Sequence, residues 1–183
     1  SMYCPEGSES PSGVGSCPRG HYCPNGTVTA DPQRNDTTLR PYPCTPGTYC
    51  LAGVGDKRVK KGDYAYAQPC FPGFYCESAS VDPKGSGECP AGFYCPEGTG
   101  LPIPTPRGFY AERKGTVSPA RCLPGKYAPT LQTEACKPCP PGTACENDGM
   151  AVATICSPGF YRSIEFDDDG KEVDGLPCRA CPQ

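Results

Sequence analysis

The chain has 183 residues, of which 16 are cysteine, 23 are glycine and 25 are proline, and its formal net charge is −3. Leu, Ile, Val and Phe together contribute only 23 residues, well below the level of about 20% at which a chain can bury a large apolar core. The small charge excludes a general attraction to nucleic acid or anionic lipid. No run of about 20 apolar residues is present to span a membrane. Disulfides are therefore expected to replace the core, as they do in small secreted domains.

The N-terminal region favours the secretory route. The chain opens SMYCPEG, without the basic and apolar segments of a signal peptide, as expected for a mature secreted protein or a fragment. Asn25 and Asn35 begin N-x-[ST] sequons and are predicted to be glycosylated. Together with the even number of cysteines, the sequons predict an extracellular or cell-surface protein that uses the secretory pathway.

One short motif recurs along the chain. It has cysteine at its first position, glycine at its fourth and tyrosine at its sixth, as in CPAGFYC at 89–95. We call each seven-residue copy a head. Heads begin at Cys17, Cys44, Cys70, Cys89, Cys122, Cys139 and Cys156, with a truncated copy at Cys4 and a copy at Thr105 that lacks the cysteine. From Thr105 onward the heads recur every 17 residues, so the sequence is a repeat array.

Each position of a head predicts local structure. Proline near the first position fixes φ for a turn, and the glycine suits a turn position with positive φ. Seven of the eleven tyrosines occupy the sixth position, where the ring is expected to begin a short strand and to cover a neighbouring disulfide. The predicted fold is small, disulfide-rich and mostly irregular, an elongated tandem array of short β-hairpins with almost no helix. Only GMAVATIC at 149–156 is apolar enough for one or two helical turns.

The predicted disulfide cysteines are Cys4, Cys17, Cys23, Cys44, Cys50, Cys70, Cys76, Cys89, Cys95, Cys122, Cys136, Cys139, Cys145, Cys156, Cys178 and Cys181. Sequence alone does not fix their pairing, and two local registers are possible. In the first, the last cysteine of one head bonds the first cysteine of the next, giving Cys4–Cys17, Cys23–Cys44, Cys50–Cys70 and Cys76–Cys89. In the second, each C-x5-C closes on itself. We favour the first because it staples the variable loops, and we expect Cys122–Cys136 to close a hairpin.

Two segments outside the heads have distinctive composition. A basic cluster at 56–63 contains Lys57, Arg58, Lys60 and Lys61; it is a candidate site for sulfated glycan, although such clusters are more often solvated loops. The proline-rich strip LPIPTP at 101–106 is expected to be extended and stiff. We place the boundary there, between an N-terminal domain 1–101 with longer loops and a C-terminal domain 102–183 of period 17.

Residues 122–145, CLPGKYAPTLQTEACKPCPPGTAC, resemble the ephrin-receptor-like cysteine-rich repeat. That repeat is related to the tumour-necrosis-factor receptor and EGF-like modules. The units CPAGFYCPEGT and CPNGT are similar to arrays in large surface proteins of protists, among them the cysteine-repeat modular proteins. The resemblance implies extracellular spacing, adhesion or assembly without catalysis, and no cofactor.

Candidate chemical sites are few. His21 is the only histidine and lies inside a head, where an exposed strand position is the simpler interpretation than a catalytic base. Cys136, Cys139, Cys178 and Cys181 form a CxxC…CxxC set that could hold zinc, but the other cysteines favour disulfides. Asp167 and Asp169 resemble the start of a calcium loop, yet the twelfth position of an EF-hand would fall on a leucine, which favours a solvated acidic turn.

Two functions from different classes fit these features. The first is a non-catalytic extracellular structural or adhesion module that acts as a spacer or binds other extracellular proteins. The second is a self-assembling glycoprotein subunit of an extracellular filament or surface coat, of the flagellar-hair type, because head-to-tail contacts that do not close form fibres. An enzyme is a distant third.

Overall fold

The structure is a computed structural model that describes residues 2–3, 15–24, 27–29, 31–32, 40–59, 61–62, 66–162, 168–169 and 177–182. The chain divides into two compact units. Unit 1 comprises Ser1–Cys89 and Cys95–Ile103, and unit 2 comprises Pro90–Tyr94 and Pro104–Gln183. One point of division, between residues 103 and 104, lies within the proline-rich strip.

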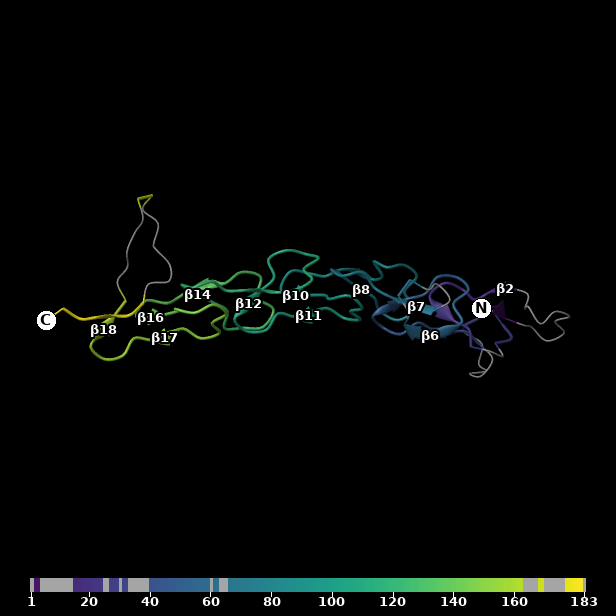
Figure 1. The fold of residues 1–183 in the computed structure, drawn as a ribbon, viewed down its shortest axis with the longest axis horizontal. Helices are drawn as coiled ribbons and strands as arrows, with labels where there is room; N and C mark the ends of the chain where they lie inside the picture. Colours follow the sequence, from purple (N-terminus) through teal and green to yellow (C-terminus); the bar gives the residue numbers. More distant parts are fainter. Residues whose placement is uncertain are drawn as a thin grey trace. The chain divides into compact units, whose positions relative to one another are not determined.

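Unit 1 is built of very short strands joined by irregular segments (Figure 1). The antiparallel pairs are β1 (Met2–Tyr3) with β2 (Gly15–Ser16), β3 (His21–Tyr22) with β4 (Tyr42–Pro43), β5 (Thr48–Tyr49) with β7 (Tyr66–Pro69), and β8 (Phe74–Tyr75) with β9 (Gly87–Glu88). A further strand, β6 (Asp56–Val59), pairs in parallel with β7 to complete a three-stranded sheet.

Unit 2 repeats the same hairpin. Its pairs are β12 (Phe109–Tyr110) with β13 (Ala120–Arg121), β14 (Lys126–Tyr127) with β15 (Lys137–Pro138), β16 (Thr143–Ala144) with β17 (Thr154–Ile155), and β18 (Phe160–Tyr161) with β19 (Arg179–Ala180). Two more strands are β10 (Phe93–Tyr94), which belongs to unit 2, and β11 (Ile103–Pro104), whose two residues fall on either side of a unit boundary in the sequence.

One rule places nearly all of these strands. Each head begins with a β-turn, whose closing hydrogen bond runs from the fifth residue to the carbonyl of the second, as from Phe74 N to Phe71 O at 3.1 Å. The head glycine is the third residue of that turn and has φ between 75° and 87° in all eight heads, which is the type II geometry. The fifth and sixth residues then form a strand. That strand pairs with the two residues preceding the next head, because the turn points it back along the chain.

The predicted fold class is confirmed. The described residues contain no helix, and short antiparallel hairpins and disulfides dominate. Residues 149–156, the one stretch apolar enough for helical turns, contain none; Thr154–Ile155 form β17, and the residues before them are irregular. The hairpin rule overrides the apolar composition there, because the residues before a head cysteine pair with the preceding head.

The disulfides differ from the register that we favoured. Heads close on themselves in Cys17–Cys23, Cys44–Cys50, Cys70–Cys76, Cys89–Cys95 and Cys139–Cys145, and two longer bridges join Cys122–Cys136 and Cys156–Cys178. Cys23–Cys44, Cys50–Cys70 and Cys76–Cys89 are therefore wrong, and so is Cys4–Cys17, because Cys17 bonds Cys23. The reason is the type II turn, which brings the first and seventh Cα atoms of a closed head to within 5.7–6.2 Å, the usual disulfide range.

The disulfides also form most of the core. Of the buried side chains, ten are cysteines with no more than 1% of their surface exposed. They are Cys17, Cys23, Cys44, Cys50, Cys70, Cys76, Cys89, Cys95, Cys122 and Cys145. Larger apolar residues such as Leu101, Leu123 and Ile155 are exposed. Stability therefore depends on the chain of small sulfur-centred clusters that the low content of aliphatic residues predicted.

Candidate functional site

Adjacent heads are joined by the same two backbone hydrogen bonds. The amide of the first residue of a head donates to the glycine carbonyl of the preceding head, as from Cys139 to Gly125 at 2.9 Å. That glycine's amide donates in turn to the carbonyl of the seventh residue of the following head, as from Gly125 to Cys145 at 2.8 Å. The same two bonds recur in both units, so each head is held in register by its neighbour.

A second set of bonds reaches the loop beyond the next head. The carbonyl of the first head residue accepts a hydrogen bond from a residue with positive φ in that loop, as from Gly149 to Cys122 at 2.8 Å. Equivalent donors are Gly53, Ala79, Gly98 and Gln132. Ala79 and Gln132, at φ 63° and 58°, are the non-glycine residues with positive φ among those that the structure describes. Each joint thus consists of two heads and one loop.

The joint leaves no room for a side chain on the interior head glycines. A Cβ atom on Gly108 would lie 2.0 Å from the carbonyl oxygen of Gly149, and one on Gly47 would lie 2.3 Å from that of Gly98. Among the described residues, nothing lies within 4 Å of a Cβ built on Gly142. Glycine is therefore required in the interior both by φ and by the loop that lies over it.

The head tyrosine covers the disulfide of the following head. Tyr49 packs in a buried cluster with Cys70 and Cys76, and Tyr22 packs against the cluster that contains Cys44 and Cys50. These contacts match the predicted use of the ring as a cover for sulfur. The sixth position of the head at 139–145 is the exception, because it is alanine, Ala144.

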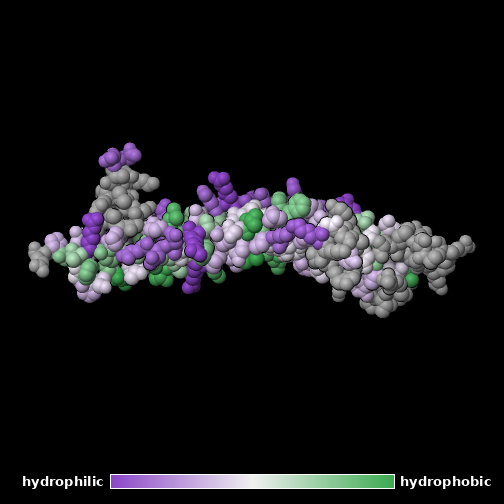
Figure 2. Space-filling view, in the orientation of Figure 1, coloured by the Kyte–Doolittle hydropathy of each residue, from purple (hydrophilic) through white to green (hydrophobic). Residues whose placement is uncertain are grey.

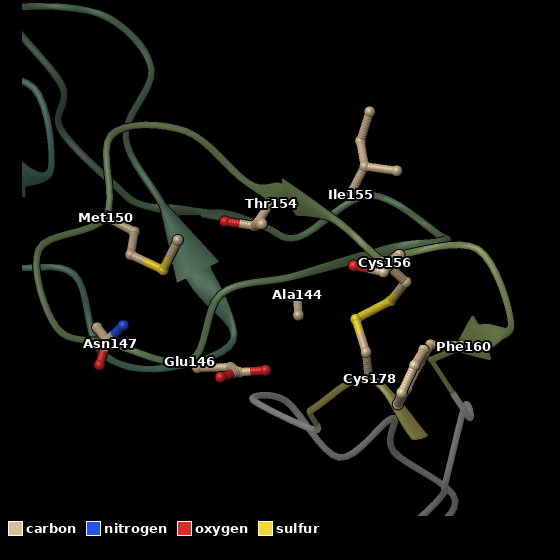
Figure 3. A pocket seen from close by; sticks show the side chains of 10 residues that line it. Ala144, Glu146, Asn147, Met150, Thr154, Ile155, Cys156, Phe160 and Cys178 are labelled. Atoms are coloured by element: carbon tan, nitrogen blue, oxygen red, sulfur yellow. A yellow bond between two sulfur atoms is a disulfide. The ribbon is translucent and has the colours of Figure 1, made fainter. Parts of the chain in front are cut away.

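A cavity of about 300 Å³ lies beside Ala144. Its walls are Met150 and Thr154 on one side and Phe160 with the Cys156–Cys178 disulfide on the other, while Glu146 and Asn147 border it (Figure 3). Outside the grey atoms, the face drawn in Figure 2 shows hydrophobic residues only as small areas between polar ones. We take the cavity as the candidate recognition feature of unit 2.

An equivalent hollow two heads earlier is smaller and contains a tyrosine. It measures about 210 Å³ and is lined by Tyr110, Glu112, Leu123, Lys126, Ala135 and Cys136. By head position, Tyr110 corresponds to Ala144, Glu112 to Glu146 and Lys126 to Phe160. Cys136 and Cys178 correspond as the disulfide partners of the first cysteine of their heads. The two sites share one architecture, and the loss of the tyrosine accompanies the larger volume.

Many predicted sites lie outside the described residues, namely Cys4, Asn25, Asn35, Lys60 and Asp167. Glycosylation therefore stays a prediction. Asp169 is described and exposed. Of the basic cluster, Lys57 and Arg58 fall in β6, and the ammonium of Lys61 pairs with the Glu97 carboxylate at 2.5 Å. Glycan binding is not tested by this placement.

The candidate chemical residues are dispersed. The ring of His21 contacts its own turn, with Nδ1 at 3.1 Å from the carbonyl oxygen of Arg19. Cys136, Cys139 and Cys178 belong to three different disulfides, so they cannot form the zinc set with Cys181. Cys181 itself is exposed and unpaired, contrary to its predicted disulfide. Within the described residues, no group of three or more His, Cys, Asp or Glu side chains is placed to hold a metal.

Sequence reasoning missed the cavity. The repeat pattern counts the head at 139–145 with the others, although its Ala144 departs from seven tyrosines. The missing aromatic ring was the available signal. It could be interpreted only after the structure showed that this position covers a disulfide.

Comparison with models of known protein families and with curated proteins found no match. In the described part of the chain, no helix is long and apolar enough to cross a membrane. The fold and its disulfides define a disulfide-stabilised, cysteine-rich module of the extracellular type.

Proposed function

We propose that the protein is a non-catalytic extracellular module whose repeats act as a spacer and present binding surfaces to other extracellular proteins. The observation that best supports this proposal is the repeated joint. In it, two backbone hydrogen bonds link successive heads around buried cysteines. Such quasi-one-dimensional stacking supports a mechanical and presenting role rather than catalysis.

The same proposal includes location and modification. Disulfides persist in oxidising compartments, which supports a secreted or cell-surface protein. We include N-linked glycans on Asn25 and Asn35 and a contact with sulfated glycan through Lys57, Arg58, Lys60 and Lys61 as parts of this role. Of this cluster, Lys57 and Arg58 lie in β6, which pairs with β7 in the sheet of unit 1.

Secretion tests this proposal. Expressed behind a heterologous signal peptide in cultured cells, the protein should appear in the medium with fourteen cysteines resistant to alkylation, corresponding to seven disulfides. Peptide N-glycosidase should lower its mass if the sequons carry glycans. A protein that is retained and reacts fully with the alkylating reagent would contradict the proposal.

One observation favours self-assembly as a second candidate. The amide of Cys181 donates to the carbonyl of Gly159 at 2.8 Å, the bond that the first residue of every later head makes. Cys181 therefore takes the backbone position that the first residue of a further head would take. Light scattering over a concentration series separates the candidates, because a spacer keeps constant mass whereas a filament subunit grows without limit.

A further inference from the structure

The cavity beside Ala144 lies at the head position where seven other heads carry a tyrosine. In unit 1 the head tyrosine packs against the next disulfide, as Tyr49 does on Cys70 and Cys76. At the site two heads earlier in unit 2, Tyr110 lines the hollow next to Cys136. The head at 139–145 keeps the features that surround the tyrosine in other heads. Ala144 pairs with Thr154, and the disulfide of the following head is present, but the aromatic ring is missing.

The walls of this cavity suit an aromatic ring. Phe160 offers a ring face, and Met150 and the Cys156–Cys178 disulfide offer polarizable sulfur (Figure 3), both of which favour contact with aromatic groups. A cavity of about 150 Å³ is enough to bind benzene in an engineered protein, and this one measures about 300 Å³. The exposed Glu146 and Asn147 border the opening and offer oxygen acceptors to a phenolic hydroxyl.

We propose that this cavity binds a tyrosine side chain presented by an extended segment of a partner protein. The partner's ring takes the place of the missing head tyrosine and covers the Cys156–Cys178 disulfide, while its hydroxyl remains at the polar opening beside Glu146. The proposal deepens the interaction role above and rests on it only for the extracellular nature of the partner.

The chain contains two methionines, which gives a direct assay. Met150 lines the cavity, whereas Met2 lies in β1 of unit 1. In methyl-labelled full-length protein, titration with N-acetyl-tyrosinamide should shift the Met150 methyl resonance upfield, through the ring current, and leave that of Met2 unchanged. The shift should saturate with a dissociation constant on the order of 1 mM, as expected for a single ring. N-acetyl-leucinamide should bind about two- to tenfold more weakly, because it cannot stack on Phe160.

Two variants complete the test. Ala144→Tyr should place a ring in the wall of the cavity, as Tyr110 does in its equivalent, so that the free Met150 resonance is already shifted and N-acetyl-tyrosinamide binds more weakly. Ala144→Ser leaves the cavity open and should bind like the parent. No saturable shift in the parent, equal binding of the leucine probe, or unchanged binding by Ala144→Tyr would each overturn the proposal. These shifts are measured on dilute protein, so they fail or succeed independently of secretion and of self-assembly.

Discussion

The backbone amide of Thr133 donates a hydrogen bond to Oγ1 of Thr105 at 2.9 Å, and both residues are buried. Thr105 is the first residue of the head that lacks a cysteine, and its seventh position is the buried Ala111. Ala111 also donates its amide to the carbonyl of Thr133 at 3.0 Å. The head that has no disulfide is therefore held by hydrogen bonds to Thr133, in the loop that follows the next head.

Thr105→Val should destabilise unit 2, because it keeps the shape of the side chain but leaves the buried amide of Thr133 without an acceptor. We expect a loss of about 1–3 kcal/mol in the free energy of unfolding, measured by urea denaturation followed by tyrosine fluorescence. Thr116→Val is the control, since that hydroxyl is partly exposed and donates to the Arg113 carbonyl. Equal losses in the two variants would contradict this role of Thr105.

The double variant Thr105→Cys, Ala111→Cys should form a disulfide spontaneously. The two positions correspond to Cys89 and Cys95, which close their own head with Cα atoms 5.9 Å apart. Closing so short a loop should contribute about 2 kcal/mol, partly offset by loss of the Thr105–Thr133 bond. Intact mass before and after reduction should reveal the extra bridge, and the single variant Thr105→Cys should remain a free thiol. A double variant with two reactive thiols would show that this head differs from the others.

Gly108→Ala should be far more damaging than Gly142→Ala. Both glycines have positive φ, at 84° and 75°, which costs alanine roughly 1 kcal/mol. Among the described residues, a carbonyl meets the new methyl group only at position 108, where Gly149 O lies 2.0 Å away. We therefore expect a further loss of roughly 2 kcal/mol or more there. Urea midpoints of the two variants measure the difference. Similar midpoints would mean that the loop does not constrain the head glycine.

Ala79→Gly and Gln132→Gly should each stabilise the protein by about 0.5 kcal/mol, because glycine relieves positive φ at both positions. Ala128→Gly is the matched control. It replaces a fully buried alanine outside the residues with positive φ, and it should destabilise by about 1 kcal/mol from added chain entropy and lost packing. Thermal melts of the three variants show directly whether each substitution raises or lowers the melting temperature. A lower melting temperature for both glycine variants would contradict the assigned strain.

The repeat pattern predicted the local structure well and the long-range structure poorly. Glycine at the fourth head position predicted positive φ, which the structure confirms at all eight heads, because a turn residue is determined by its neighbours in sequence. The disulfide partner of Cys23 was wrong because cysteine spacing is compatible with both registers, and only the turn geometry selects Cys17. Ala79 and Gln132 could not be identified as left-handed, since neither residue type indicates it.

The cavity illustrates a different limit. The alanine at position 144 is visible in the sequence, but its consequence depends on how a head packs against the next disulfide. Cys156 and its partner Cys178 are separated by 22 residues. No period of 17 predicts that pair, so the wall of the cavity could not be anticipated.

Disulfide mapping by mass spectrometry of non-reduced peptides tests the central claim most directly, namely that heads close on themselves and stack through backbone bonds. The structure predicts bridges Cys17–Cys23, Cys44–Cys50 and Cys70–Cys76 within heads, Cys122–Cys136 across a hairpin, and a free Cys181. Bridges that join one head to the next, such as Cys23–Cys44 or Cys50–Cys70, would contradict it.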